Sequence, residues 1–492
     1  MFPKYPYSDV HQLNLDWILE RISKAITSVN GTTPDENGNV NLPGIAGVSS
    51  VLGIGPDGSG NVQFSESWVP GHNYVSVTEF GAAGDGVEDD SAAIQQALNT
   101  NSAVFFPAGT YICKDVKIPS HRRMLGCNAV LIPAGASNIM RNDGDGITSG
   151  YTQNEDIIIE GLEFDMQSTI CTGLAFGHCN NIVIKNCRFK NCVNWHMIEL
   201  NAAAECRILG CYFYNQFGNT EMIQLDSMVN QGVFPWFGPV DGMGCVDIVI
   251  ASCQFENLAP TADGGTFTSA IGNHSTNPNF PICSRLVFAN NTVRNLGSIG
   301  KFVGVENSLF VNNTGTNMVN GFWLDQSTKD VIIANNNITG NKNAPSLAFQ
   351  SRGIAVFYPA ENTHCINNLV SGFLSHGITL QGEHNLCGQN TVTNCDGAGI
   401  YCGWYEHDSM YYDNISKNNT GVNMYLNFLL PASVTYTLGQ IYVHDNDCDN
   451  LTTAGGDPDD PVFIYHNVAA SINNGLQNVT VKDNIINGVW TA

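Results

Sequence analysis

The stretches that decide the fold are Leu286–Val293, LVFANNTV, Leu309–Thr316, LFVNNTGT, and Val331–Ile338, VIIANNNI. In each of these stretches, alternating apolar residues are followed by a pair of polar turn residues, usually two asparagines. Nine further segments align with these three, and one equivalent position falls at Leu162, Cys187, Cys211, Cys253, Asn291, Asn313, Asn336, Asn368, Asn390, Asn414, Asn446 and Asn484. A basal period of about 22–25 residues, lengthened by insertions, is typical of a solenoid.

The residue types of the repeat predict an all-β chain, a right-handed parallel β-helix of about twelve or more coils. The units are short, β-branched and alternating, and no ten-residue helical pattern lies between them. Successive strands would then stack about 4.8 Å apart. We expect the asparagine column to form an inward turn with left-handed backbone, its amides hydrogen-bonding along the stack. Cys187, Cys211 and Cys253 would continue the column as free thiols.

The composition argues against several classes of protein. Lys and Arg total 20 against 44 Asp and Glu, a formal charge of −24, which disfavours nucleic acid and anionic membrane as partners. No stretch of 18 apolar residues occurs, and the start lacks the continuous apolar core of a secretion signal. The 16 cysteines include no CxxC pair and no zinc spacing, so we expect buried reduced thiols, no metal and no other cofactor.

The segment 77–120 predicts a cap on the first coil. We expect a helix from Ser91 to Leu98, capped by Asp89 or Asp90, and then a strand from Ala103 to Phe106. The helix residues expected to plug the open end are Ala92, Ile94, Ala97 and Leu98.

This segment, VTEFGAAGDGVEDDSAAIQQAL followed by VFFPAGTY, resembles the amino-terminal part of the pectate-lyase-3 or polygalacturonase-like superfamily. With the coils behind it, the resemblance covers roughly residues 77 to 490. It implies that Asp85, Asp89 and Asp90 are turn and cap residues, not a catalytic cluster.

The first 70 residues do not follow the pattern of the repeat. Residues 12–29, QLNLDWILERISKAITSV, carry about two heptads of apolar spacing, which fit either a coiled coil or a plain amphipathic helix. Two turn-strand copies follow, PDENGNVNL at 34–42 and PDGSGNVQF at 56–64. The predicted organisation is an attachment segment at 1–30, fibre-like repeats at 31–70, a cap with the first coils at 71–135, and the β-helix at 136–492.

The opening YPYSDVHQLNLDWIL resembles the attachment segment of tail or appendage proteins in phages of low-GC Gram-positive hosts. Together with the fibre-like repeats and the β-helix, it resembles phage tailspike and preneck-appendage proteins. The resemblance implies a homotrimer that docks residues 1–30 on portal, tail or collar proteins, binds bacterial surface glycan and sometimes degrades it. It also implies assembly in the host cytoplasm and a final place in the virion.

Candidate site residues follow from the strand after each turn, where alternate residues point outward. Aligning Ile198–Asn201, Ile223–Asp226, Val303–Glu306 and Phe322–Asp325 places carboxylates beside aromatic residues on one face. Glu306 and Asp325 would lie roughly 5 Å apart, near the spacing of a retaining glycosidase pair, and Asp226 and Glu306 roughly 10 Å apart, nearer the inverting range. The residues expected to contact glycan are Glu199, Trp323, Tyr401, Gln381 and His376, with His196 or His376 assisting proton transfer.

The site departs from the polygalacturonase pattern, so the residues leave three readings open. His376-Gly377 fits one element of that pattern, but the preceding coil has no aspartate pair and no Arg-x-Lys follows. A galacturonan-specific enzyme is therefore disfavoured. The readings are a virion spike that binds host polysaccharide, with or without degrading it, a non-enzymatic structural or adhesion appendage, and a free polysaccharide hydrolase or lyase. Whether the chain has catalytic activity is left open.

Overall fold

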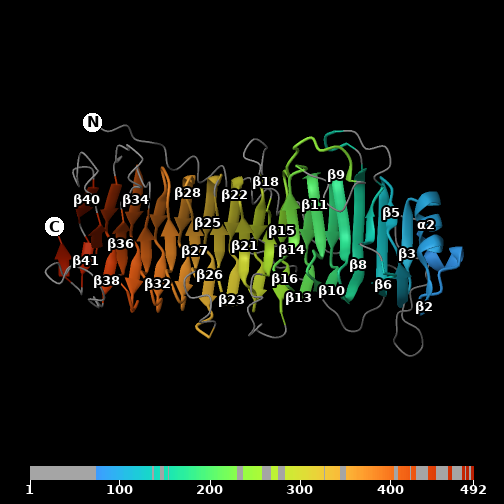
Figure 1. Ribbon diagram of the computed structural model, residues 1–492, viewed down its shortest axis with the longest axis horizontal. Coiled ribbons are helices and arrows are strands. Elements are labelled where there is room, and N and C mark those ends of the chain that lie inside the picture. Colours follow the sequence, from blue (N-terminus) through green and yellow to red (C-terminus); the bar gives the residue numbers. More distant parts are fainter. Residues whose placement is uncertain are drawn as a thin grey trace, which may run out of the picture. The chain divides into compact units, whose positions relative to one another are not determined.

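The computed structural model describes residues 74–491 except 136–137, 144–148, 153, 230–236, 258–267, 275–282, 326, 344–350, 404–407, 422, 428–440, 450–463, 468–478, 483 and 487–488. The predicted attachment segment and fibre-like repeats lie outside the described residues. Within them, the chain winds into coils whose strands pair in parallel with those of the next coil, as Figure 1 shows. No helix among these residues is long and apolar enough to cross a membrane.

Three parallel sheets, here named A, B and C, run along the stack. Sheet A contains β12 (Arg207–Leu209), β15 (Val249–Ala251), β19 (Val287–Ala289), β22 (Val305–Val311), β25 (Lys329–Ala334), β28 (Glu361–Ile366), β31 (Leu386–Gly388), β34 (Ser409–Tyr412), β37 (Ile441–His444) and β40 (Val479–Lys482). Sheet B contains β10 (Arg188–Val193), β13 (Tyr212–Phe217), β16 (Gln254–Glu256), β20 (Thr292–Arg294), β23 (Thr314–Met318), β26 (Asn337–Gly340), β29 (Leu369–Ser371), β32 (Thr391–Thr393), β35 (Ile415–Lys417), β38 (Asp447–Asp449) and β41 (Asn484–Ile486).

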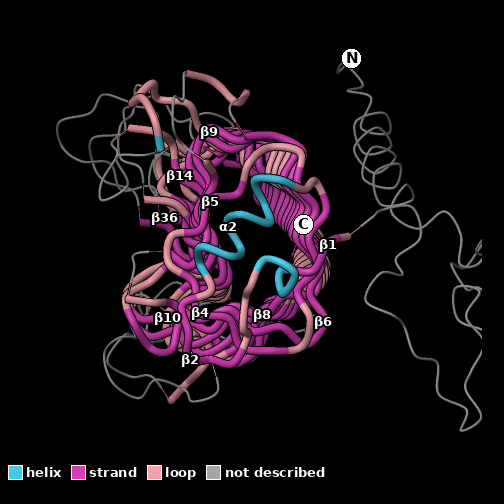
Figure 2. The backbone as a smooth tube through the Cα atoms, turned by 90° about the vertical axis from the view of Figure 1, so that its right-hand side faces the viewer, coloured by secondary structure: helices cyan, strands magenta, loops and turns pink. Residues whose placement is uncertain are grey.

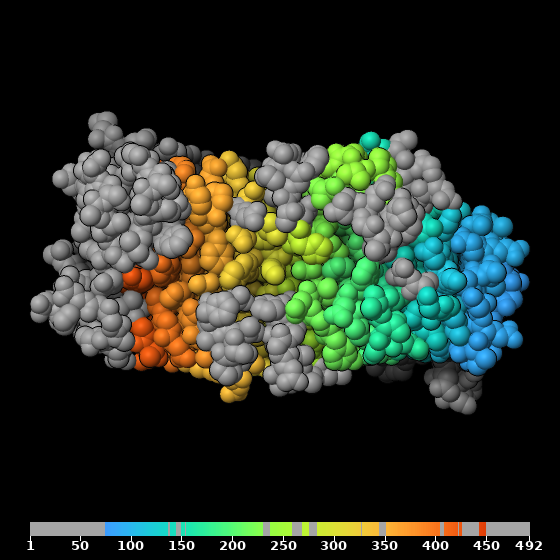
Figure 3. Space-filling view, viewed as in Figure 1, coloured from blue at the N-terminus to red at the C-terminus, as the bar shows by residue number. Residues whose placement is uncertain are grey.

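Sheet C carries the candidate site. Its strands are β7 (Asn138–Asn142), β9 (Thr172–Lys185), β11 (Ile198–Ala204), β14 (Glu221–Asp226), β17 (Ser269–Gly272), β21 (Ser298–Phe302), β24 (Phe322–Leu324), β27 (Ile354–Val356), β30 (Ile378–Leu380), β33 (Ile400–Cys402), β36 (Met424–Asn427) and β39 (Ile464–Asn467). Successive colours lie side by side along the stack in Figure 3, so the order of coils follows the order of the sequence.

The first coils are built from longer strands and closed by a helix. They contain β1 (Val75–Ser76), η1 (Val77–Phe80), β2 (Asp85–Asp89), α2 (Ser91–Thr100), β3 (Ala103–Phe106), β4 (Gly109–Cys113), β5 (Val116–Ile118), β6 (Arg122–Pro133) and β8 (Asn154–Thr169). Figure 2 shows α2 lying across one end of the ring of strands. Helix α2 buries Ile94, Ala97 and Leu98 fully, as predicted. Ala92 is exposed, so it does not help to close the end of the β-helix.

The acidic residues beside α2 are structural. The Asp90 carboxylate accepts hydrogen bonds from the backbone N–H groups of Ala83, at 2.6 Å, and Ile112, at 3.2 Å. Asp85 accepts from the N–H groups of Val87 and Glu88. Asp90 occupies the N-cap position but makes no side-chain capping bond, because its carboxylate joins the turn before β2 to β4 instead.

The asparagine column is a continuous ladder of buried amides. Each Nδ2 donates to the Oδ1 of the asparagine in the next coil, at 2.9–3.1 Å, and the ladder comprises Asn291, Asn313, Asn336, Asn368, Asn390, Asn414 and Asn446. Each Oδ1 also accepts the backbone N–H of the preceding column residue, for example Asn313 N to Asn336 Oδ1 at 2.9 Å. The predicted stack is therefore confirmed.

The backbone bend falls one residue earlier than predicted. The left-handed φ belongs to the residue before each ladder asparagine, such as Asn290, Asn312 and Asn335, all at 57°. The two asparagines of each pair thus have different structural roles. The first takes the left-handed backbone, which asparagine tolerates, and the second places its amide inside the tube.

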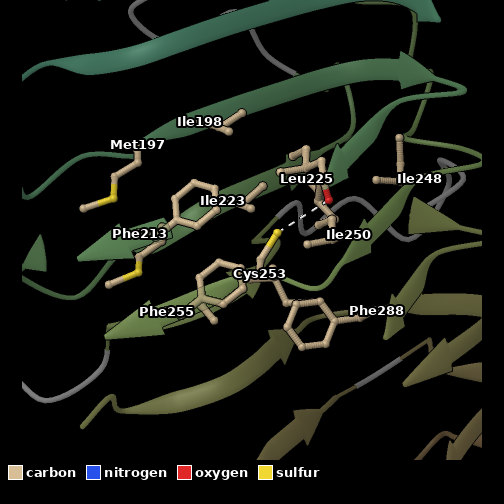
Figure 4. Close-up of a cluster of buried hydrophobic side chains, with 14 of the residues drawn as sticks. Met197, Ile198, Phe213, Ile223, Leu225, Ile248, Ile250, Cys253, Phe255 and Phe288 are labelled. Atoms are coloured by element: carbon tan, nitrogen blue, oxygen red, sulfur yellow. Dashed lines mark hydrogen bonds between the residues drawn. The ribbon is translucent and has the colours of Figure 1, made fainter. Parts of the chain in front are cut away.

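The interior of the earlier coils is filled by stacked rings and thiols. Phe164, Phe189, Phe213 and Phe255 stack in register with centroids 4.8–5.0 Å apart. Figure 4 shows the Cys253 thiol among such apolar side chains. All sixteen cysteines are free, and every one except Cys127 is buried, which confirms the prediction of buried reduced thiols.

We predict that Asn336→Ala destabilises the β-helix by roughly 3 kcal/mol, because it removes the Oδ1 that accepts hydrogen bonds from the buried Asn313 N–H and from the Asn313 side-chain amide. The thermal unfolding midpoint should fall, and hydrogen exchange at Asn313 should accelerate. Asn337→Ala is the matched control, since that neighbouring side chain is exposed, and it should cost less than about 0.5 kcal/mol. Equal effects of the two substitutions would contradict a stabilising ladder.

Candidate functional site

The outward face of sheet C brings most of the predicted site residues into register. Glu199 pairs with Gln224 on the next coil, and Asn201 with Asp226. Further along, Trp323, Ala355, Thr379 and Tyr401 occupy one column of paired residues. The apolar residues between them face the core, as the alternation predicted.

The predicted Glu306–Asp325 pair does not form, and neither does the two-coil spacing of Asp226 and Glu306. Strand β21 pairs with β24 so that Lys301, not Gly304, lies opposite Trp323. Glu306 belongs to β22, where it pairs with Lys329 of sheet A. The alignment omitted β17 and shifted the next coil by three residues, because Gly272 and Asn273 interrupt the apolar alternation there.

A group of polar side chains on three successive coils forms what we call the acidic pocket: His196, Glu199, Glu221, Gln224, Asp226 and His274. The first five are at most 8% exposed. Met228 and Phe237, which follow β14 in the sequence, form a separate apolar cluster with Ala175 and Ala202 of sheet C. Phe237 lies against Gly177, where an added Cβ would come within 2.4 Å of its ring.

Asp226 is fully hydrogen-bonded. Its Oδ1 accepts the backbone N–H of His274 at 3.0 Å. Its Oδ2 accepts from the Gln224 amide at 2.5 Å and lies 3.1 Å from His274 Nδ1. Asp226 therefore holds His274 in place, and its oxygens are occupied by partners within the pocket.

Glu199 and Glu221 differ from Asp226, because each has a buried oxygen without a partner. Glu199 Oε1 accepts from the Asn201 amide at 3.0 Å, but Glu199 Oε2 has no hydrogen bond. Glu221 Oε2 is likewise buried without a hydrogen bond and lies 3.7 Å from His274 Nε2. Glu221 Oε2 also lies 3.9 Å from His196 Nδ1, so both histidines are within ion-pair distance of this oxygen.

The environment of the acidic pocket raises the pKa values of some of its groups and lowers those of others. Burial raises the pKa of Glu199 to about 8, and burial also raises the pKa of Glu221. Burial disfavours ionised Asp226 as well, yet the hydrogen bond and charge of His274 outweigh it and lower the Asp226 pKa. The hydrogen bond to Asp226 raises the pKa of His274 to about 9, whereas burial lowers the pKa of His196 to about 4. Such divergence is common at functional sites.

Rings continue the same face beyond the pocket and form what we call the aromatic ladder: Trp323, Phe357, His376, Tyr401 and Tyr425. Trp323 and Phe357 have centroids 4.6 Å apart, and the Arg352 guanidinium lies 5.6 Å and 5.3 Å from their centroids. Tyr401 lies between His376, at 4.8 Å, and Tyr425, at 5.2 Å. All five rings are partly exposed, so each offers part of its surface to a ligand.

The remaining predicted residues lie beside this ladder. His376 Nδ1 accepts the Ala398 N–H at 2.9 Å, and burial lowers its pKa to about 4, so the ring is neutral and suited to stacking. Gln381 Oε1 accepts the Tyr358 N–H at 3.4 Å. Asp325 follows β24 and is half-buried, with its N–H bonded to Phe302 O at 2.8 Å.

Sequence reasoning missed Glu221 and His274. Glu221 stands two residues before the inward-facing Ile223, so strict alternation would have placed it inside, and His274 follows β17, the strand that the alignment omitted. Two groups in the described ranges bring three possible metal ligands within 4.8 Å: His196, Glu221 and His274, and the more exposed His121, Glu155 and Asp156.

Comparisons with known proteins agree with this fold. A family model described as rhamnogalacturonase A/epimerase, pectate lyase-like, matches residues 74–126, and one described as periplasmic copper-binding protein (NosD) matches residues 267–435. The plasmin and fibronectin-binding protein A of Streptococcus pneumoniae is 24% identical over 331 residues, covering 56% of this chain and 45% of the relative. The pre-neck appendage protein of Bacillus phage phi29 is 35% identical over 101 residues, covering 18% and 11%.

The chain therefore spans less than half the length of these curated relatives. Among solved structures, the tailspike of E. coli bacteriophage HK620 superposes with a TM-score of 0.51 at 12% identity, covering 84% of this chain and 78% of the tailspike. The chain has the right-handed β-helix fold of tailspikes and is similar in sequence to phage preneck appendage proteins.

We predict that Glu199→Gln removes a pH dependence of stability. The folded wild type keeps Glu199 protonated below about pH 8, whereas the unfolded chain ionises near pH 4.5, so wild-type stability falls as pH rises between these values. The variant should match wild type near pH 4 and exceed it above pH 8, by an amount on the order of 4 kcal/mol. The measurement is the thermal unfolding midpoint across pH 4–9, in buffer containing a chelator.

The exposed Glu205 supplies the control, because Glu205→Gln should leave the pH profile almost unchanged. Parallel wild-type and Glu199→Gln profiles would mean that Glu199 ionises in the folded protein at its ordinary pH.

Proposed function

We propose that this chain is a virion appendage of a bacteriophage and that sheet C binds a polysaccharide on the surface of the bacterial host. The observation that carries the binding proposal is the aromatic ladder, whose rings occupy neighbouring coils on one outward face. Sugar rings have apolar faces that stack on aromatic side chains, and strands about 4.8 Å apart repeat such platforms along the axis. A polymer lying along the stack would meet several of them at once.

The phage assignment rests on similarity. The phi29 relative is named a pre-neck appendage protein, and the HK620 tailspike, which shares the fold, was solved in complex with a pentasaccharide. The segment 5–19 and the repeats at 34–42 and 56–64 add the features of an attachment segment and a fibre. We propose that residues 1–30 attach the chain to other virion proteins and that three copies assemble, because a lone turn-strand repeat cannot bury itself.

Polysaccharide cleavage is a second candidate function, and the opposite pKa shifts of the buried carboxyl groups Glu199 and Asp226 in the acidic pocket favour it. A carboxyl group that remains protonated near neutral pH can act as a general acid, and Glu199 has that property. Because Asp226 is engaged with His274 and Gln224, Glu221 is the second carboxyl group proposed to act beside Glu199. A pure adhesin would retain the aromatic ladder but show no turnover.

We predict that Trp323→Ala and Tyr401→Ala each weaken polysaccharide binding about 5- to 10-fold, as expected for the loss of one stacking contact. Binding is measured with capsule and teichoic-acid preparations from low-GC Gram-positive bacteria. Tyr212→Ala is the matched control, because Tyr212 is a partly exposed ring on sheet B. An affinity that falls equally for Tyr212→Ala, or not at all for the two ladder variants, would refute binding along sheet C.

Cleavage of the bound polysaccharide is tested separately from binding. If the acidic pocket cleaves the bound polymer, wild type releases reducing ends or phosphomonoesters, and Glu199→Gln lowers the rate at least about 100-fold while binding persists. Retained binding without release by wild type would select the non-enzymatic appendage.

A further inference from the structure

The outward face of sheet A is apolar over seven consecutive strands, from β15 to β34. In each strand two outward residues flank a buried inward residue such as Phe310, and together these outward residues form what we call the apolar face. The second of its two columns runs from Ala251 to Tyr412, and neither column contains Asp, Glu, Lys or Arg. The first column consists of Val249, Val287, Leu309, Ile332, His364, Leu386 and Met410, all partly exposed except Val287.

Other outward surfaces of the β-helix are not apolar. On the earlier coils of sheet A the same two columns contain Arg207 and the ion pair between Glu160 and Lys185, at 2.8 Å. On sheet B, outward positions beside the apolar face are occupied by Glu256 and Arg294. Single exposed apolar residues are normal, whereas a contiguous apolar surface over seven coils indicates an interaction surface.

Polar residues border the apolar face on both sides. Where the chain approaches the strands, Arg285 pairs with Asp247 and Lys329 with Glu361, each at 2.8 Å. Where the chain leaves them, the exposed residues with left-handed backbone follow, such as Asn312. An uncharged centre inside a polar rim is typical of protein–protein interfaces.

The dimensions of this surface suit the association of two copies of the chain. Six steps of about 4.8 Å make the apolar face roughly 30 Å long, and the six residues from rim to rim make it roughly 20 Å wide. Contact over that area would bury on the order of 600 Å² per copy, or about 1,200 Å² between two copies, which reaches the lower end of stable interfaces.

Two further features favour a second copy of this chain as the partner. Because the formal charge is −24, two copies repel each other where charged surfaces meet, and an uncharged face is where they can approach. The chain also enters the β-helix on this sheet, since β1 pairs with β3 and β3 with β6, in the inward column that continues to Ile208 and Ile250. The residues to which we assign assembly, 1–73, therefore connect to the first strand of sheet A.

We propose that copies of this chain associate side by side through the apolar face of sheet A, each turning this face toward a common axis parallel to the stack. The proposal rests on the proposed function for the number of copies, three, and adds the surface through which they meet. Because every copy presents the same face to the axis, the assembly is closed. The contact uses no residue of the aromatic ladder, so assembly and polysaccharide binding take place on different sheets.

The test is sedimentation velocity of the full chain at micromolar concentrations. The double variant Leu309→Glu/Ile332→Glu places two carboxylates on neighbouring coils of the apolar face. Wild type should be a trimer, and the double variant should associate at least about 100-fold more weakly, because like charges then meet in the contact. The matched control is Thr314→Glu/Asn337→Glu, which changes two exposed, paired residues of sheet B and should leave association unchanged. Circular dichroism verifies that the variants fold.

Cross-linking locates the contact even where residues 1–73 hold the copies together. Ile332→Cys should be joined between copies by a short bismaleimide, whereas Asn337→Cys, on the outward face of sheet B, should not. Both substitutions are made together with Cys127→Ser, because Cys127 is the one exposed cysteine of the chain.

A monomeric wild type would overturn this proposal and, with it, the assembly of three copies. Undiminished association of Leu309→Glu/Ile332→Glu, without cross-linking at Ile332→Cys, would overturn the apolar face alone, and so would an equal loss of association in the sheet B control. Polysaccharide binding is measured separately with Trp323→Ala, so neither result decides whether sheet C binds glycan.

Discussion

The registration of one coil on the next is the constraint on which the whole structure depends. A one-residue slip would reverse the inside and outside of a strand. The asparagine ladder opposes such a slip, because every amide from Asn291 to Asn414 bonds to the coils before and after it. The same registration stacks the phenylalanines inside and aligns the rings outside. Residues far apart in the sequence, such as Trp323 and Tyr401, are thereby brought onto one face.

The sequence predicted those parts of the fold that repeat locally. The ladder asparagines, the inward alternation of Ile198 and Leu200, and the helix that begins at Ser91 all follow from patterns within about ten residues. The misplaced bend shows a limit of such patterns. In an Asn-Asn pair either residue can take the left-handed backbone, and only the structure shows that it is the first, as at Asn312.

The candidate site was less predictable, because its residues belong to coils separated by insertions. The steps from Cys211 to Cys253 and from Cys253 to Asn291 are 42 and 38 residues, well above the basal period. Within that interval β17 lacks apolar alternation. The alignment of coils from the sequence therefore assigned Glu306 to the wrong register and did not include His274. Burial was also invisible in the sequence. Glu199 was expected to face solvent, but it is only 6% exposed.

The asparagine ladder and the acidic pocket differ in how completely their buried polar atoms are hydrogen-bonded. In the asparagine ladder each inner amide uses both hydrogens and accepts two hydrogen bonds, as Asn336 does, which stability alone explains. In the acidic pocket, by contrast, Glu199 and Glu221 each keep a buried oxygen without a partner. Folding gains nothing from such atoms, and Gln or an apolar residue would cost less. Buried carboxyl groups kept beside two histidines at this energetic cost therefore argue for a functional role of the acidic pocket.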